Sequence, residues 1–214
     1  MFLCLRVDLD YVPWDSPDAA EFGHGEPAVF LRLLDFARSR GYRFHFFASE
    51  RVLRALPSVP DAVLNEGHDL DWLCKHPESL DRKTEALTLF SLVGHKPVGL
   101  ALKGAWPAQA ASGLSDGFLF LSAAPGPAPT GLTLFPVETR AVREAHRGGA
   151  SIRTWTDSLK TQLRDFASRD RDLTVVVRPQ VLAKLDPHLL SLKDVLALAE
   201  AVGLRIATLR QALP

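Results

Sequence analysis

Short apolar runs alternate with stretches of helical periodicity along the whole chain. Residues 3–10, Leu-Cys-Leu-Arg-Val-Asp-Leu-Asp, form an apolar run that stops on two carboxylates, which is typical of a strand buried on both faces of a parallel sheet. The same patterns predict further strands at 42–48, 68–73, 98–102, 118–121, 132–137, 173–177 and 204–208. Helices are predicted at 27–40, 49–56, 60–65, 78–93, 156–167 and 192–201, and a loop at 123–131.

This alternation of strands and helices implies right-handed crossovers between parallel strands. The predicted fold class is therefore α/β, with about seven parallel strands that either close into a barrel or form an open, doubly wound sheet. In both folds the active site lies at the carboxyl ends of the strands. The charged or reactive side chains predicted at those ends are Asp8, Asp10, His76, Lys103 and Arg178.

Length and composition favour a single domain that spans residues 1–214. The chain has 214 residues and 47% hydrophobic content, which is enough for one sizeable core. Lys plus Arg and Asp plus Glu number 25 each, so no net charge would attract nucleic acid or an anionic membrane. Cys4 and Cys74 are predicted to be reduced packing residues. Because neither a leader pattern nor a long apolar segment is recognised, we expect a soluble, cytoplasmic protein.

Asp8 and Asp10 are predicted to share one face of the first strand with Arg6, because side chains alternate along a strand. Two neighbouring carboxylates repel each other and lose hydration when buried, so a buried pair needs a cation, an arginine or a shared proton. The alternative is that the strand simply ends in solvated aspartates.

Taken in order, the motifs resemble those of polysaccharide deacetylases of the nodulation-factor type, carbohydrate esterase family 4. The similar segments are Arg6-Val7-Asp8-Leu9-Asp10, His45-Phe46-Phe47-Ala48, Gly67-His68-Asp69-Leu70 and His76-Pro77. The resemblance implies a distorted (β/α) barrel that hydrolyses N-acetyl or N-formyl groups on sugars with a divalent metal. By position it implies that Asp8 is the general base and that Asp10 and His76 are metal ligands.

Three positions depart from the family pattern. Trp72 stands where the first metal-binding histidine is expected, and Ala101 stands where an arginine is expected, although Lys103 is close by. Arg178, followed by proline, replaces the late histidine that acts as general acid. Arginine keeps its proton near neutral pH, so Arg178 would instead hold an anion or neutralise Asp8.

The third metal ligand would then come from Asp71, Asp69 or His24. Of these, Asp71 is the predicted third ligand, and Zn²⁺, Mn²⁺ or Mg²⁺ is the candidate ion. An oxygen-rich ligand set would favour the harder ions Mn²⁺ and Mg²⁺. The alternative is that the metal has been lost. Lys103, Trp106 and Trp72 are predicted to contact the substrate.

Two functional hypotheses follow from the resemblance. One is a hydrolase that removes N-acyl groups from a sugar or related metabolite. The other is an inactive deacetylase-like barrel that binds a glycan or a charged metabolite, in which Arg178 replaces the metal as the counter-charge of Asp8 and Asp10. A small molecule or carbohydrate is the expected partner in both cases.

Two further enzyme classes also use an Asp-x-Asp motif. In phosphatases of the haloacid dehalogenase type the first Asp is phosphorylated, but a late acidic pair is needed, and the late strand here ends in Val177-Arg178-Pro179. Sugar-nucleotide transferases normally carry the motif in the middle of the chain, whereas it lies here on the first strand.

Overall fold

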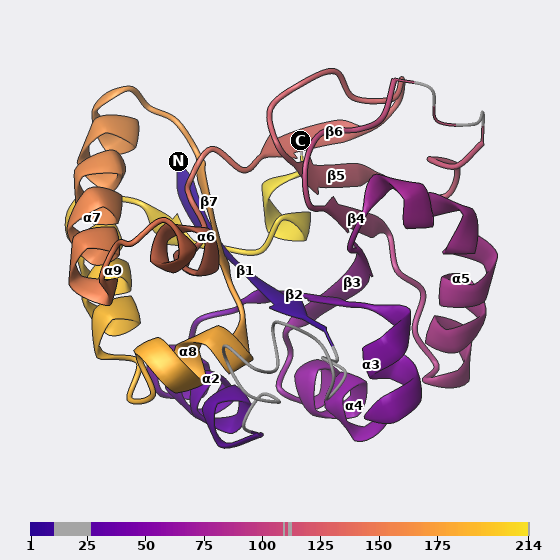
Figure 1. The fold of residues 1–214 in the computed structure, drawn as a ribbon, viewed down its shortest axis with the longest axis horizontal. Coiled ribbons are helices and arrows are strands. Elements are labelled where there is room, and N and C mark those ends of the chain that lie inside the picture. The colour runs from indigo at the N-terminus through magenta and orange to yellow at the C-terminus, as the bar shows by residue number, and fades with distance from the viewer. Residues whose placement is uncertain (11–26, 109, 111–112, 214) are drawn as a thin grey trace.

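The protein contains one continuous parallel sheet that is curved around a central space (Figure 1). The computed structural model describes residues 1–10, 27–108, 110 and 113–213. The strand order is β6-β5-β4-β3-β2-β1-β7, and β8 pairs with the beginning of β1. The strands are β1 (Phe2–Leu9), β2 (His45–Ala48), β3 (Asp69–Cys74), β4 (Gly99–Leu102), β5 (Phe120–Ala123), β6 (Thr133–Pro136), β7 (Leu173–Val177) and β8 (Arg205–Ile206).

Helices cover the convex side of this sheet (Figure 1). The α-helices of the described residues are α2 (Pro27–Arg40), α3 (Glu50–Ala55), α4 (Ser58–Asn65), α5 (Lys83–Leu92), α6 (Val142–Arg147), α7 (Ile152–Ser168), α8 (Pro179–Leu185) and α9 (Leu190–Ala201). Two 3₁₀ helices, η1 (Pro77–Arg82) and η2 (Arg210–Ala212), complete the set. Within the part of the chain that the structure describes, no helix has the length and apolarity needed to cross a bilayer.

The ends of several helices follow from residues visible in the sequence. The hydroxyl of Ser151 accepts a hydrogen bond from the backbone N–H of Thr154 at 3.0 Å, which caps the first turn of α7. Gly41 follows α2 with φ of 67°, a left-handed conformation that favours glycine at a helix end. The end of α2 therefore lies where it was predicted, whereas α7 begins at Ile152 and not at the predicted residue 156, because the cap at Ser151 was not recognised.

The sequence patterns missed two short helices and merged two others. The helices α6 and α8 have six and seven residues, too few to display a repeated apolar stripe. The helix predicted at 78–93 is divided into η1 and α5, with the boundary at Arg82 and Lys83.

The two faces of the sheet have different compositions. On β1, Leu3, Leu5 and Val7 point outward into a large apolar core shared with the helices. Phe2 and Cys4 point inward, toward a smaller cluster that also contains Phe47, Leu73, Ala101, Phe120, Phe135, Ala207 and Leu209. All eight residues of β1 are buried, so the prediction of a strand covered on both faces is confirmed.

The curved sheet forms a distorted, incompletely closed barrel. The strands at the two ends of the order, β6 and β7, approach each other. Thr139, which follows β6, donates its hydroxyl hydrogen to the carbonyl oxygen of Thr174 in β7 at 2.8 Å. The predicted α/β fold with a distorted barrel is therefore confirmed. Cys4 and Cys74 are free and buried on opposite faces, as expected for reduced packing residues.

Candidate functional site

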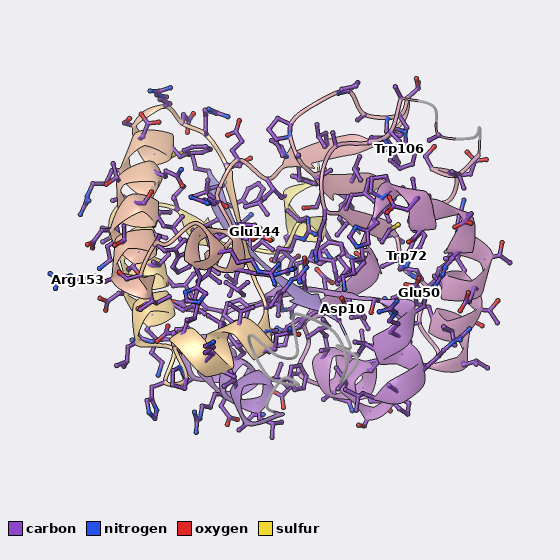
Figure 2. All side chains as sticks on the ribbon, in the orientation of Figure 1. Asp10, Glu50, Trp72, Trp106, Glu144 and Arg153 are labelled. Atoms are coloured by element: carbon purple, nitrogen blue, oxygen red, sulfur yellow. The ribbon has the colours of Figure 1, made fainter. Side chains whose placement is uncertain are left out.

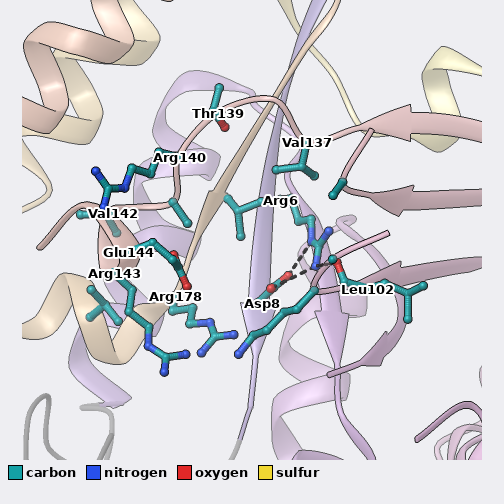
Figure 3. Close-up of a pocket in the computed structure, with 16 residues that line it drawn as sticks. Arg6, Asp8, Leu102, Val137, Thr139, Arg140, Val142, Arg143, Glu144 and Arg178 are labelled. Atoms are coloured by element: carbon teal, nitrogen blue, oxygen red, sulfur yellow. Dashed lines mark hydrogen bonds and ion pairs between the residues drawn. The ribbon is translucent and has the colours of Figure 1, made fainter. Parts of the chain in front are cut away.

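A cavity of about 360 Å³ opens at the carboxyl ends of the barrel strands (Figure 3). Its walls come from β1, from β7 with the turn into α8, and from the segments that follow β4, β5 and β6. The lining residues are Arg6, Asp8, Leu102, Lys103, Gly104, Ala124, Val137, Thr139, Arg140, Ala141, Val142, Arg143, Glu144, Val176, Arg178 and Val181. Asp8, Lys103 and Arg178, predicted as site residues from separate strands, thus line one cavity.

The Asp8 carboxylate is paired with Arg6, two residues earlier on the same strand (Figure 3). Arg6 Nε lies 2.7 Å from Asp8 Oδ1, and Arg6 Nη2 lies 3.1 Å from Asp8 Oδ2. Both residues are almost fully buried. The same guanidinium reaches across the barrel to the carbonyl oxygens of Ser122 and Leu102 and to the Ser122 hydroxyl. Arg6 therefore supplies the counter-charge of Asp8.

This pairing corrects the hypothesis that Arg178 replaces the metal as counter-charge. The register pairs Val7 with Val177, so Arg178 follows β7 at the level of Asp8 on the neighbouring strand. Its side chain points into the cavity (Figure 3). Within the described part of the chain, however, the Arg178 guanidinium forms no hydrogen bond or ion pair, because Arg6 already occupies both oxygens of Asp8.

Asp10 is bound by a different cation. Its Oδ2 lies 2.5 Å from Lys75 Nζ, and its Oδ1 accepts a hydrogen bond from the Ser49 hydroxyl at 2.9 Å. The Asp10 side chain is only 2% exposed. Because Ser49 and Lys75 follow β2 and β3, they hold Asp10 above the carboxyl ends of these strands. An ammonium group thus stands beside the carboxylate that was predicted to bind a metal.

His76, the second predicted metal ligand, lies at the surface. It is the residue before η1, and its carbonyl oxygen accepts a hydrogen bond from the Cys74 thiol at 3.1 Å. It does not line the cavity that contains Asp8 and Arg178. The candidate ligand His24 lies outside the described residues.

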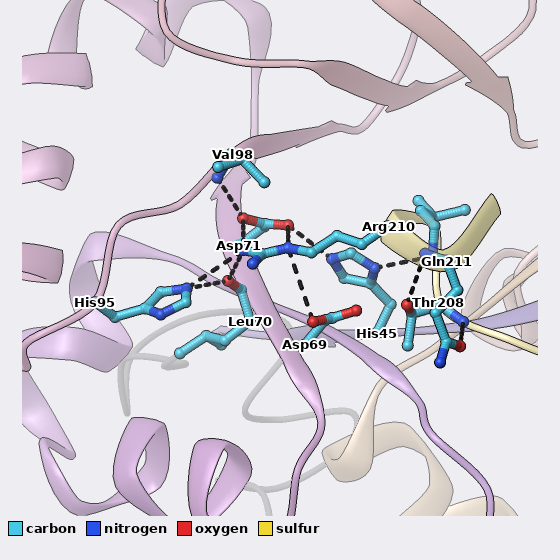
Figure 4. A network of polar contacts seen from close by, with 10 residues as sticks. His45, Asp69, Leu70, Asp71, His95, Val98, Thr208, Arg210 and Gln211 are labelled. Atoms are coloured by element: carbon cyan, nitrogen blue, oxygen red, sulfur yellow. Dashed lines mark hydrogen bonds and ion pairs between the residues drawn. The ribbon is translucent and has the colours of Figure 1, made fainter. Parts of the chain in front are cut away.

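Asp71 faces the barrel interior, but it belongs to a buried polar network near the amino ends of the strands (Figure 4). Its Oδ1 accepts from Arg210 Nη2 and from the Val98 backbone N–H, at 2.8 and 2.7 Å. Its Oδ2 lies 2.9 Å from His45 Nε2. The prediction of Asp71 as a metal ligand is wrong, because both oxygens are occupied by protein donors and Asp10 is bound elsewhere.

The same network determines the ionisation of Asp71. Burial alone would raise its pKa, but the hydrogen bond from His45 and the guanidinium of Arg210 outweigh burial and lower the pKa to about 2. The Leu209 backbone N–H donates to His45 Nδ1 at 3.1 Å, so the ring proton must lie on Nε2 and point to Asp71. The network fastens the C-terminal segment, from β8 to η2, to the inside of the barrel.

The two tryptophans predicted to contact substrate lie elsewhere (Figure 2). Trp72 is fully buried on the outer face of β3, where it stacks on Phe118 at a ring-centroid distance of 6.0 Å. It is therefore a core residue, and the predicted substrate contact is wrong. Trp106 is half-buried and packs against the same outer core, outside the cavity lining.

Sequence reasoning missed several charged residues of the site. Lys75 was passed over although it directly precedes the His76-Pro77 motif. Arg6 shares the inward face with Asp8, and the period of two along the strand was the available signal. Arg140, Arg143 and Glu144 lie in a segment with no predicted element, so no pattern placed them at the cavity.

A divalent metal, as the family resemblance implies, does not fit the side chains that the structure describes. Among them no group of three His, Cys, Asp or Glu side chains is arranged to hold an ion, whereas catalytic zinc normally has three protein ligands. Lys75 lies against Asp10 and Arg6 against Asp8, so a cation at either carboxylate would face an existing positive charge.

Comparisons with known proteins agree with this fold. No family model and no curated protein sequence matches the chain. Among solved structures, a probable polysaccharide deacetylase from Pseudomonas aeruginosa PAO1 has a TM-score of 0.73 and 14% identity, covering 98% of this chain and 88% of that chain. The PuuE allantoinase has a TM-score of 0.75 and 12% identity, with coverages of 98% and 87%.

A third similar structure is a mutant of a pseudoenzyme of carbohydrate esterase family 4 in which enzymatic activity was restored. Its TM-score is 0.61 and its identity 10%, and the match covers 98% of this chain and 66% of that chain. At these identities the likeness concerns the fold. The chain therefore has the fold of the polysaccharide deacetylases, as the order of its sequence motifs predicts.

Proposed function

We propose that the protein binds a small sugar or a related metabolite in the barrel cavity without metal-dependent hydrolysis. The observation that carries the proposal is the internal neutralisation of both aspartates, Asp8 by Arg6 and Asp10 by Lys75. In a metal-dependent deacetylase these two positions would face the ion and the water that it activates. Here protein cations are bound to both aspartates instead, and Arg178 occupies the position of the family's late histidine.

The size and lining of the cavity support a small ligand. A volume of about 360 Å³ lies in the range of small-molecule sites, roughly 300–1,000 Å³. Apolar side chains of Val137, Val142, Val176 and Val181 line the cavity together with five basic and two acidic side chains, so both apolar and polar contacts can orient a ligand. The neighbours of similar fold include a polysaccharide deacetylase and an allantoinase, so both sugars and other small metabolites are candidate ligands.

The described neighbours also include a pseudoenzyme of carbohydrate esterase family 4. The family of these neighbours thus contains a member described as a pseudoenzyme. This precedent supports a binding function for the present chain, whose site departs from the family pattern at Trp72, Ala101 and Arg178.

A hydrolase that removes N-acyl groups is the second candidate function. The observation that favours it is that Asp8, the predicted general base, lines the cavity together with Lys103 and Arg178. In this alternative, Asp8 would activate water and the two cations would stabilise the oxyanion electrostatically. Asp8→Asn should then abolish turnover.

One experiment discriminates between the two functions. The purified protein is incubated with N-acetylglucosamine oligomers, with chelator or with added Zn²⁺, Mn²⁺ or Mg²⁺, and released acetate is measured beside the melting temperature. We expect no acetate release and the same melting temperature in chelator as in buffer. Acetate release, with or without added metal, that disappears in Asp8→Asn would overturn the binding proposal.

A further inference from the structure

Among the residues that the structure describes, the lining of the cavity carries more basic than acidic side chains. Its lining contains five cationic side chains and two carboxylates, Asp8 and Glu144. The cationic residues are Arg6, Lys103, Arg140, Arg143 and Arg178. The chain as a whole has equal numbers of basic and acidic residues, so the excess of positive charge is a local property of this cavity.

Arg6 does not account for this excess, because all of its donors are used within the protein. Its Nε donates to Asp8, its Nη1 to the carbonyl and hydroxyl of Ser122, and its Nη2 to Asp8 and to the Leu102 carbonyl. A guanidinium has five N–H donors, and each has an acceptor here. Arg6 and Asp8 therefore form a closed, neutral unit in the cavity wall.

In contrast to Arg6, Arg178 has no acceptor for its donors among the described residues. It is 6% exposed. Lys103, on the wall formed after β4, likewise forms no hydrogen bond or ion pair with the described residues. Lys103 is half-buried, but for the buried Arg178 the lack of a partner is unfavourable, because a buried cation loses hydration without compensation. Within the described part of the chain, both cations are therefore available to pair with an anionic group that enters the cavity.

We infer that the cavity binds its ligand through an anionic oxygen group, a carboxylate or a phosphate, held by Arg178 and Lys103. This inference rests on the proposed function, that the cavity binds a small molecule, and specifies the class of that molecule. The pairing of Asp8 with Arg6 favours it, because it neutralises one of the two carboxylates in the lining and leaves Glu144 as the other. The planar guanidinium of Arg178 matches carboxylate and phosphate oxygens with two parallel hydrogen bonds.

The ligand panel for the test contains glucuronate, glucose 6-phosphate and glucose, which share a ring and differ in the anionic group. Binding to the full chain is measured by isothermal titration calorimetry and by the shift in melting temperature. We expect one or both anionic sugars to bind at least tenfold more tightly than glucose. The preferred anion then identifies the ligand as a carboxylate or a phosphate.

Arg178→Gln should weaken binding of the anionic sugars at least tenfold. The matched control is Arg153→Gln, which removes the same charge from an exposed position on α7, where the Arg153 side chain is 92% exposed and points away from the barrel (Figure 2). The control should bind as the wild type does. Lys103→Gln provides a second variant at the site, and Arg178→Lys, which retains the charge, should keep part of the affinity.

Three outcomes would contradict the inference. Equal loss of affinity in Arg178→Gln and Arg153→Gln would mean that only the overall charge matters. Binding of glucose as tight as that of the anionic sugars would overturn the anionic class while leaving the proposed function intact. Absence of binding for all three sugars at millimolar concentration would count against both.

Discussion

Arg6→Met tests the central electrostatic argument, that Arg6 and not Arg178 balances Asp8. The substitution keeps much of the side-chain volume but removes every donor that Arg6 directs at Asp8, Ser122 and Leu102. Asp8 is 2% exposed, so its carboxylate would remain buried with no charged partner in hydrogen-bond contact. The Arg6→Met protein should be much less stable than the wild type.

The expected size follows from measurements on comparable buried pairs. Removing one partner of a buried ion pair costs about 3 to 5 kcal/mol, because the remaining charge has lost its hydration and has no compensation. Domains have total stabilities of about 5 to 15 kcal/mol, so this loss is a large fraction of the whole. With a urea dependence near 2 kcal/mol/M, a loss of about 4 kcal/mol moves the midpoint down by about 2 M.

The assay is equilibrium unfolding in urea at pH 7, followed by tryptophan fluorescence. The double variant Arg6→Met with Asp8→Leu should recover most of the loss, because replacing a buried pair by apolar side chains is often neutral or stabilising. The comparison variant is Arg178→Met, for which we expect a loss below about 1 kcal/mol or a gain, since Arg178 has no described partner to abandon. If Arg178→Met destabilised the protein more than Arg6→Met, the assignment of the counter-charge would be wrong.

The remaining predictions concern the polar network, the Asp10 ion pair and the packing inside the barrel. The pKa of Asp71 is lowered from 3.8 to about 2, so ionisation of Asp71 contributes about 2 kcal/mol to the free energy of unfolding above pH 4. This contribution is lost as the pH falls toward 2. Asp71→Asn should therefore be less stable at pH 7, and its stability should lack this dependence on pH during acid unfolding. Lys75→Met should lower the free energy of unfolding by about 2 kcal/mol, because the buried Asp10 oxygen loses its charged donor. Lys75→Arg, which keeps a cation at this position, should lose less stability. An unchanged urea midpoint in Lys75→Met would count against a structural role for the Lys75–Asp10 pair. Gly99→Ala would place a Cβ atom against the ring of Phe120 and should cost about 1 to 3 kcal/mol through overpacking. Gly126→Ala, whose Cβ would have its nearest atom at 3.5 Å, should melt close to the wild type. Equal melting temperatures for the two variants would refute the close approach of Gly99 and Phe120.

The fold was predictable because its signals are local and repeated. Each apolar run between turn residues gave a strand, and the alternation with helices required parallel strands whatever the details of packing. Asp8 and Arg178 were correctly expected at carboxyl ends of strands, where they line one cavity. The alternation along β1 also placed Arg6 and Asp8 on one face of the strand, as the structure has them.

The partners of the charged groups were not predictable in the same way. Whether Asp8 meets Arg6 or Arg178 depends on side-chain conformations and on acceptors at Ser122 and Leu102, which lie more than ninety residues away. Asp71 faces the barrel interior, but its pairing with Arg210 depends on the C-terminal segment that folds back into the barrel. Trp72 occupies a metal-ligand position in the motif. Because side chains alternate along β3, however, Trp72 points outward into the core.

The position of β1 in the sheet bears on how the protein acquires its structure during synthesis. β1 is made first and pairs early with β2, but its other neighbours, β7 and β8, begin at residues 173 and 205. Until these strands emerge, β1, an eight-residue strand that is buried along its whole length, has an open edge, which is a site for pairing with other chains. Contacts between residues so distant in sequence also slow folding. The nascent chain is therefore expected to depend on chaperones until β7 has been made, and slowing translation before residue 173 should increase aggregation.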